Sequence, residues 1–422
     1  MLKGIIVIYL IIKEVYNFIL NKIRNDYRKN PLPKEVADIY DDKRYQQFLN
    51  YKKEYQSLSY KSGFIMALFE LFIIFSPFFQ WMDYLNNVYL ILFVTITITS
   101  VVSWIVSYFE DYYATFTIEE KYGMNKKTYS VFLKDFIMEQ LMDYVMELVL
   151  YGVIVFICEH LSSWTNHFAI SYLKSFLFGL VIVVLLIVVV LALSMLSLLV
   201  MMKEYTFTDL EDQELLDNIH RMMEGCKKKI KGIKVYDESK KSTTKNAFVL
   251  GIPFYRIIGI ADNFLNENSM RQLNGVLAHE IGHLKHKKNF WNFLKYSILI
   301  LLFLCIVIAI PNGASIGKIA NWINVQFGIT HSHYYVYFLV LGILFDPLLY
   351  VYTLYSNYVT RLEEYEADQN AVKEGYGQDL IDLFKELSRD ELVDVNPSPI
   401  IEFIEYDHPG MYQRILGLEK KL

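Results

Sequence analysis

The chain has 422 residues, of which 54% are hydrophobic and 21% charged, and its formal net charge is −5. The hydrophobic residues are concentrated in long runs, which excludes an ordinary soluble protein and indicates membrane spans. The small net charge gives no indication of nucleic-acid binding. The three cysteines are scattered and odd in number, which excludes a disulfide framework and a cysteine zinc cluster.

Seven runs are long and apolar enough to be candidate transmembrane helices. The first starts close to Met1 and has no small-residue cleavage site, so we expect a retained anchor. The fourth is the shortest, and the fifth is long enough to project beyond a hydrocarbon layer of ~30 Å. The seven runs are Gly4–Leu20, Ser62–Trp81, Val88–Phe109, Met146–Leu161, Tyr172–Met202, Trp291–Ile310 and Tyr335–Tyr358.

Lys and Arg are concentrated in every second segment between these runs. The basic segments are Lys22–Lys61, Lys121–Lys134 and Lys227–Lys245, whereas 83–87 and 162–170 have no Lys or Arg and 311–334 has one. The positive-inside rule therefore predicts a lumenal or exoplasmic N-terminus and a cytosolic C-terminus.

Several ionisable residues fall within the predicted spans. Lys13, Glu14 and Glu147 lie near span ends, where long side chains can reach the interface. Glu70 and Asp346 lie deeper, so we expect them to face a water-filled chamber between the helices, with snorkelling as the alternative.

The runs divide the chain into four parts. Residues 1–202 hold five spans, 203–290 form a cytosolic segment, 291–358 hold two spans, and 359–422 form a second cytosolic segment. Within 203–290 we expect a helix followed by three short strands, the last two being neighbours across the Gly251–Pro253 turn. The helix is predicted at Asp209–Lys229 and the strands at Lys231–Tyr236, Asn246–Leu250 and Tyr255–Ala261.

The segment Leu277–His283 contains an H-E-x-x-H motif. On a helix, His279 and His283 share one face and can both bind one Zn²⁺, while Glu280 can take a proton from a water on the metal. A capping box at Ser269–Gln272 marks the helix start. The alternative is an amphipathic helix with two core histidines.

A zinc site of this kind needs a third protein ligand. Glu364 is the candidate, because Asp368 lies four residues later and can accept the distal N–H of a ligating histidine. Glu363 and Glu366 are rivals that lack such a partner.

Together, H-E-x-G-H-x-K and R-x-x-E-x-x-A-D resemble the integral-membrane zinc metalloproteases of the CAAX prenyl protease 1 type. Three further stretches carry the resemblance, although Met124 and Asp407 depart from the common pattern. These stretches are Phe116–Lys126, Asn246–Phe248, and His408-Pro409 with Arg414.

The resemblance implies a mainly α, polytopic fold. In such a fold, seven transmembrane helices would enclose a chamber, and a gluzincin-type zinc protease domain with a small β-sheet would cover it. It implies one Zn²⁺ per chain and removal of the aaX tripeptide from prenylated CaaX proteins in the endoplasmic reticulum membrane, and in some organisms the inner nuclear membrane.

The resemblance also implies a role for each site residue. His279, His283 and Glu364 bind the metal, with Asp368 and Arg361 beside them; Glu280 and His408 are catalytic; Asn246, Ala247, Phe248 and Arg414 hold the substrate. One alternative function is a membrane quality-control zinc protease that acts on misfolded or stalled proteins. Another is a transporter with a vestigial domain, which the intact His-Glu-His-Glu set argues against.

Overall fold

The computed structural model describes residues 1–167, 205–252, 255–285, 321–329 and 334–422, with a few single positions between 168 and 204. The predicted spans Tyr172–Met202 and Trp291–Ile310 lie almost entirely outside the described residues. Most of the predicted loop 311–334 also lies outside them.

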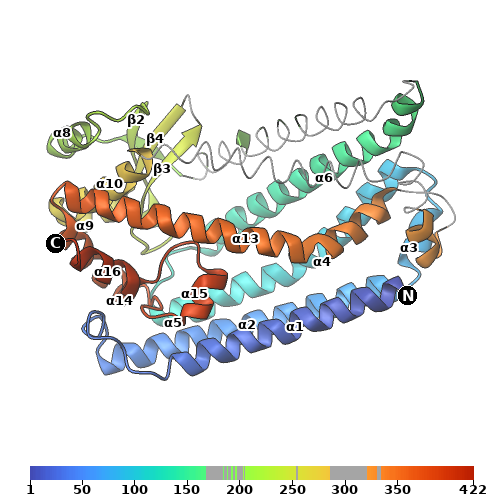
Figure 1. Ribbon diagram of the computed structural model, residues 1–422, viewed down its shortest axis with the longest axis horizontal. Helices are drawn as coiled ribbons and strands as arrows, with labels where there is room; N and C mark the ends of the chain where they lie inside the picture. Colours follow the sequence, from blue (N-terminus) through green and yellow to red (C-terminus); the bar gives the residue numbers. More distant parts are fainter. Residues whose placement is uncertain are drawn as a thin grey trace.

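Long helices run along the longest axis of the molecule (Figure 1). Within the described residues, three stretches are long and apolar enough to cross a membrane: Leu2–Tyr27, Asp42–Phe75 and Val88–Tyr122. They contain the first and third predicted spans and most of the second. The fourth and seventh predicted spans fall within long helices, and their crossing stays a prediction. The helices of this part are α1 (Leu2–Tyr27), α2 (Asp42–Phe75), α3 (Phe78–Asp83), α4 (Val88–Tyr113), the π-helix η1 (Ala114–Glu119), α5 (Glu120–Tyr122), α6 (Tyr129–His167) and α13 (Tyr334–Lys373).

The prediction that the second span runs to Trp81 was wrong at its end. Helix α2 stops at Phe75, and Ser76 is extended, with a ψ of 166°. The ring of Pro77 disfavours helical geometry for the residue before it, which explains the break. A separate helix, α3, then starts at Phe78.

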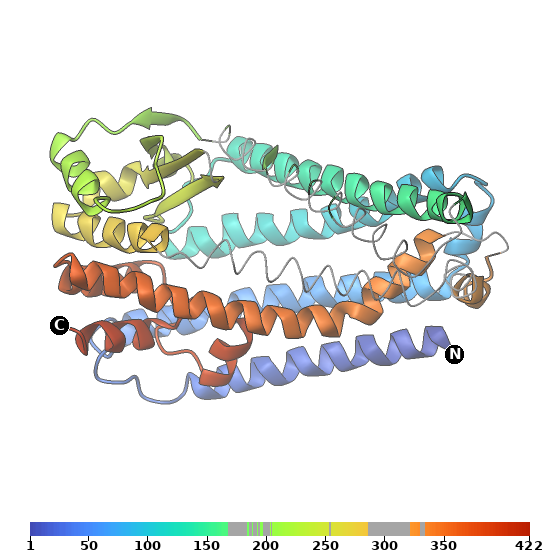
Figure 2. The ribbon, with the colours of Figure 1, turned by 45° about the horizontal axis from the view of Figure 1, so that its top comes forward.

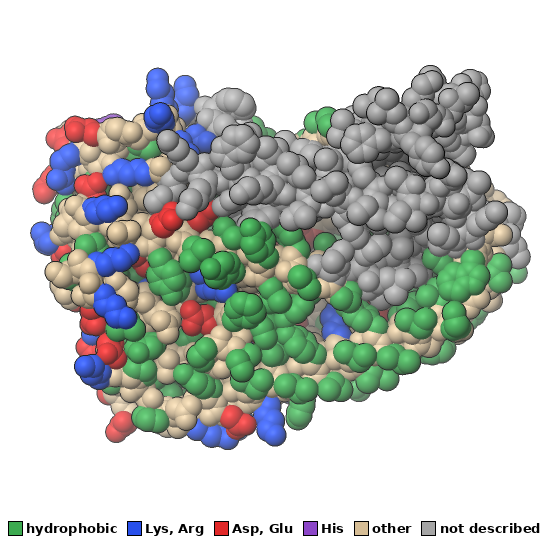
Figure 3. Space-filling view, in the orientation of Figure 1, with side chains coloured by type: hydrophobic (Ala, Val, Ile, Leu, Met, Phe, Trp, Pro, Cys, Tyr) green, Lys and Arg blue, Asp and Glu red, His purple; other side chains and the backbone are tan. Residues whose placement is uncertain are grey.

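Many apolar side chains of the long helices face outward. Ile8 on α1 is 59% exposed, Phe64 on α2 63% and Ile105 on α4 54%. Figure 3 shows hydrophobic side chains along these helices, whereas most of the charged side chains gather at the left end of the view, where the C-terminus lies. Apolar surface of this extent matches a lipid environment.

A four-stranded mixed sheet has the order β1-β2-β4-β3. The two strands β3 and β4 are neighbours, as predicted, and pair antiparallel, whereas β2 pairs parallel to β4. The predicted helix at Asp209–Lys229 was too long: Phe207–Asp209 is a strand, and the Asp212 side chain caps a shorter helix by accepting from the Leu215 amide. The elements are β1 (Phe207–Asp209), α8 (Gln213–Met222), β2 (Gly232–Tyr236), η2 (Glu238–Lys240), β3 (Ala247–Ile252), β4 (Tyr255–Ala261), α9 (Asp262–Glu267) and α10 (Met270–Lys285).

The C-terminal segment packs beside these elements and completes a core with them (Figure 2). The loop between α1 and α2 joins the same core, because the Tyr40 hydroxyl lies 2.6 Å from the Ser388 carbonyl and 2.8 Å from the Val393 carbonyl. The C-terminal helices are α14 (Gly377–Asp390), α15 (Pro399–Glu405) and α16 (Met411–Glu419).

Helix α10 packs closely against the C-terminal half of α13. It starts with the predicted capping box, since Ser269 and Gln272 exchange side-chain to main-chain hydrogen bonds. A Cβ on Gly282 would lie 2.8 Å from the Ala367 Cα, so this position has no room for a side chain. The contact is further held by Asn370, whose Nδ2 donates to the Ala278 carbonyl at 2.7 Å.

We expect Gly282→Ala to separate α10 from α13. The added methyl group meets main-chain atoms of Ala367 that cannot turn away, so the free energy of unfolding should fall by about 1–3 kcal/mol and bound metal should decrease. Gly275→Ala is the matched control, because its Cβ would make ordinary contacts of 3.4 Å or more. Thermal unfolding and metal analysis on both proteins test this, and equal results for the two would contradict it.

Candidate metal and active site

Two histidines of α10 and one glutamate of α13 converge at the interface of these helices. His279 Nε2 and His283 Nε2 are 3.2 Å apart. Glu364 places one carboxylate oxygen 3.4 Å from the first and the other 3.2 Å from the second. One ligand atom from each residue lies within 4.8 Å of the others, a spacing that can hold a metal ion.

The chemistry of this donor set fits a divalent metal. The Glu364 Oε2 atom is fully buried and makes no hydrogen bond to a described residue, although His279 Nε2 and an Arg414 nitrogen both lie 3.4 Å from it. A buried carboxylate oxygen that makes no hydrogen bond keeps the capacity to bind a cation. Imidazole nitrogens with one carboxylate are typical ligands of a transition-metal ion.

The pKa shifts of His279 and Glu364 also favour a cation in this site. Burial by itself would lower the pKa of His279, but hydrogen bonds to Asp368 and Glu364 outweigh burial and raise it to about 9. Burial would raise the pKa of Glu364, but His279, His283 and Arg414 hold it well below its usual range. Two anionic side chains thus favour positive charge between them, as a proton or as a metal ion.

Asp368 orients His279. The Nδ1 atom of His279 donates to Asp368 Oδ1 at 2.9 Å, which leaves Nε2 as the atom that faces Glu364. Asp368 is 4% exposed, and Arg414 contacts it with two nitrogens at 2.6 and 3.0 Å. A paired, buried carboxylate of this kind fixes the ring and its tautomer.

Arg414 is buried beside Asp368 and Glu364, and we did not predict these contacts from the sequence. It is 6% exposed, approaches Glu364 Oε2 to 3.4 Å, and its guanidinium lies over the Phe384 ring at 4.2 Å. The resemblance implied that Arg414 supports the substrate or the position of His408; the structure shows its charge against Asp368 and Glu364, and its contact with substrate stays a prediction. No sequence spacing relates the first turn of α16 to α13, so pattern reasoning could not find this.

Arg361 and His408, two further residues predicted for the site, are connected through the chain segment at the end of α15. The Arg361 guanidinium donates to the carbonyls of Glu402 and Tyr406 at the end of α15, so it supports the chain that leads to His408. His408 is 57% exposed in its side chain, with Nε2 at 3.4 Å from Glu364 Oε1 and Nδ1 at 2.9 Å from Asp407 Oδ1. It therefore stands on the open side of the site.

Glu280 faces a pocket of about 280 Å³ that also contains the three ligand residues, His408 and Arg414. Burial raises the pKa of the Glu280 carboxyl, although the neighbouring histidines partly offset this. Asn246 and Ala247 line the same pocket at the start of β3. The Phe248 ring instead packs near Gly259 and against Tyr236, with ring centroids 5.2 Å apart.

The rival glutamates lie elsewhere. Glu363 and Glu366 line a separate cavity of about 340 Å³ on another face of α13. The structure therefore brings Glu364 to the histidines, as the spacing to Asp368 predicted.

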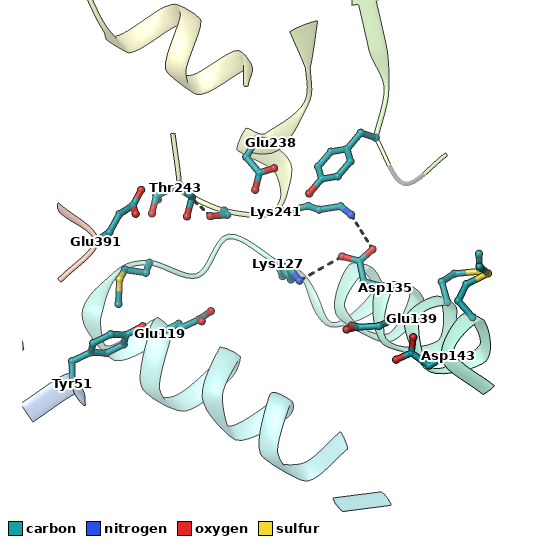
Figure 4. Close-up of a pocket in the computed structure, with 16 residues that line it drawn as sticks. Tyr51, Glu119, Lys127, Asp135, Glu139, Asp143, Glu238, Lys241, Thr243 and Glu391 are labelled. Carbon is teal, nitrogen blue, oxygen red and sulfur yellow. Dashed lines mark hydrogen bonds and ion pairs between the residues drawn. The ribbon is translucent and has the colours of Figure 1, made fainter. Parts of the chain in front are cut away.

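A larger cavity of about 710 Å³ lies next to the segment before β3 (Figure 4). Its walls carry six carboxylates among sixteen lining residues, and its two lysines, Lys127 and Lys241, both pair with Asp135, at 3.5 and 3.1 Å. Thr244 lines this cavity and the next residue, Lys245, lines the metal pocket, so the two spaces are adjacent along the chain. The sequence pattern gave no signal for this acidic cavity.

Two family models match the chain. Residues 22–196 match "CAAX prenyl protease N-terminal, five membrane helices". Residues 209–421, half of the chain, match "Peptidase family M48".

Several curated proteins are similar over most of their length. The probable CAAX prenyl protease 1 of Schizosaccharomyces pombe is 28% identical over 93% of this chain and 82% of its own. The CAAX prenyl protease 1 of Saccharomyces cerevisiae is 28% identical over 73% of this chain and 67% of its own. The crystal structure of S. mikatae Ste24p superposes with a TM-score of 0.84 at 25% identity, over 99% of both chains.

We expect Arg414→Gln to weaken metal binding although Arg414 is no candidate ligand. Asp368 would lose its bidentate partner, and loss of such support for a ligating histidine typically costs about 10- to 100-fold in affinity. Chelator competition measures the affinity. Arg361→Gln is the control, because it removes an equally buried arginine whose described contacts are to main-chain carbonyls and the Phe403 ring and not to Asp368 or Glu364. An equal loss in both variants would show a general folding defect instead.

Proposed function

Because the chain belongs to peptidase family M48 and is a membrane-embedded metalloprotease, we propose that it removes the C-terminal aaX tripeptide from prenylated CaaX proteins. One observation carries this proposal. The chain that holds His279, His283 and Glu364 also contains residues 22–196, whose sequence matches the N-terminal membrane helices of CAAX prenyl proteases. The similarity to relatives of that name spans both parts of the chain.

We propose one Zn²⁺ per chain, held by His279, His283 and Glu364, since two imidazoles and one carboxylate with an open side are typical of catalytic zinc sites. When bound, the ion supplies Lewis acidity that polarises the scissile carbonyl and activates water. Asp368 and Arg414 hold the donor atoms in place before the substrate arrives.

Glu280 acts as the general base in this proposal. It lies next to His279 in the chain and faces the same pocket. Because burial raises the pKa of its carboxyl, Glu280 is a stronger base than an exposed glutamate, and it can return the proton to the leaving amine. His408, on the open side of the pocket, can donate a hydrogen bond to the oxyanion.

The substrate is proposed to pair with the free edge of β3. Within the described sheet β3 is the edge strand, with β4 on its inner side. Main-chain groups at Asn246 and Ala247 then bind the peptide whatever its side chains are, and place the scissile bond in the metal pocket.

We also propose an orientation in the membrane, which the arrangement of the two ends of the chain supports. The N-terminus and the C-terminus lie at opposite ends of the longest axis (Figure 1). With the positive-inside rule, this supports a lumenal N-terminus and a cytosolic site in the endoplasmic reticulum membrane. Asp346 accepts a hydrogen bond from Tyr9 and lies 3.6 Å from Lys13, so its charge is compensated. The hydrated chamber around Glu70 and Asp346 remains part of the proposal.

Glu280→Gln should abolish cleavage and retain the metal. The change is nearly isosteric and removes the base, so turnover should fall by about 10²-fold or more. Metal content and cleavage are measured on one preparation. Glu366→Gln is the control, since Glu366 lies outside the metal pocket. Near-normal turnover of Glu280→Gln would rule out this role.

A farnesylated CaaX peptide should be cleaved far better than the same peptide without its lipid. The prenyl group binds alike in the ground and transition states, so the difference should appear chiefly in KM. Steady-state kinetics on the two peptides measure it. Equal KM and kcat for both would favour the quality-control alternative, in which the protease recognises exposed chain rather than the lipid.

A further inference from the structure

We propose that the cavity between α1 and α2 binds the phosphate headgroup of an anionic membrane lipid. The cavity has a volume of about 490 Å³. One wall is the stretch of α1 from Glu14 to Arg28, the other is the stretch of α2 from Lys52 to Gly63, and Glu405 of α15 lies at the rim. The proposal does not depend on the proteolytic function.

Two donors in this cavity have no acceptor among the described residues. Lys52 is half-buried and forms no ion pair within the described part of the chain, where Asp394 and Glu391 act on its ammonium group only at longer range. Its one aromatic contact is with the adjacent Tyr51 ring, at 5.0 Å. One turn later, the Nε2 atom of Gln56 is fully buried and has no hydrogen-bond partner. A shielded ammonium and a buried amide donor without acceptors favour an anion with several oxygens.

The two arginines of the cavity are already paired with carboxylates, which leaves Lys52 for a ligand. Arg24 is paired with Glu405, and Arg28 is paired with Asp394 at 2.8 Å. Glu14 lies fourteen residues before Arg28 on α1, which is about 21 Å along the helix at ~1.5 Å per residue. The negative charge of Glu14 is therefore remote from the Lys52 end.

The position of the cavity favours a lipid over a soluble anion. It opens where the basic segment between the first two spans meets their apolar surfaces. Phe18 on α1 and Phe64 on α2 are 62% and 63% exposed, and the two helices run side by side in both ribbon views (Figures 1 and 2). A headgroup beside Lys52 would let its acyl chains lie along this apolar surface, as polybasic juxtamembrane segments bind acidic lipids.

The experiment measures lipid binding to the full-length protein purified in a neutral detergent. Phosphatidylglycerol and phosphatidylcholine are added separately, and apparent affinities are obtained from native mass spectrometry and from the shift in unfolding temperature. Lys52→Gln is compared with Lys53→Gln, which removes the same charge from the exposed neighbouring residue, and with Lys52→Arg. Gln56→Ala is a second variant of the site, and inorganic phosphate without added lipid is a separate arm.

We expect the wild type to prefer phosphatidylglycerol, and Lys52→Gln to weaken that binding about five-fold, from ~1 kcal/mol per basic residue near the headgroup. Gln56→Ala should weaken it too, whereas Lys53→Gln and Lys52→Arg should bind like the wild type. Lys52→Gln should unfold at the wild-type temperature or above in phosphatidylcholine, because it removes a half-buried ammonium group whose desolvation outweighs the attraction of the nearby carboxylates. Equal losses in Lys52→Gln and Lys53→Gln, no preference between the lipids, or equal protection by inorganic phosphate would each overturn the proposal.

Discussion

The site depends on the close contact between α10 and α13. His279 and Glu364 are far apart in the chain, and they meet because Gly282 lets the two helix backbones approach at Ala367. Helix α13 continues without a break from the seventh predicted span to Glu364 and Asp368. The geometry of the metal site is therefore tied to the position of a helix that we assign to the membrane. A shift of α13 along α10 by one residue would place another side chain opposite the histidines.

Buried charges hold this contact in one arrangement. Asp368 and Arg414 are both nearly inaccessible, and each would be costly to bury without the other. Their pairing places an acceptor against the Nδ1 atom of His279 and a positive charge beside Glu364. Asp368 and Glu364 raise the pKa of His279, whereas the two histidines and Arg414 lower the pKa of Glu364. The polar network thus sets the direction of the donor atoms and the preference of the pocket for positive charge.

The sequence predicted correctly those features that depend on neighbouring residues within one helix or strand. The capping box at Ser269, the strands on both sides of the 251–253 turn, and the choice of Glu364 over its neighbours all follow from spacing within one element. The end of α2 was also readable, because Pro77 restricts Ser76. The contacts of Arg414 and Arg361 could not be predicted, since they depend on how α15 and α16 dock onto α13. The acidic cavity likewise arises from η1, α6 and the segment before β3, which are separate in sequence.

The two matched parts of the chain are joined by the basic segment after the first predicted span. Arg24 and Arg28 of α1 pair with Glu405 and Asp394, which lie in the C-terminal segment that carries His408. The same segment is fastened to the loop after α1 by the Tyr40 hydroxyl. Basic residues at the cytosolic end of a span are expected from topology alone. Here two of them also connect the membrane helices to the protease part. Lys52 lines the cavity that Arg24, Arg28 and Glu405 also line, but it forms no ion pair with a described carboxylate, and this difference is the basis on which we propose it for the lipid headgroup.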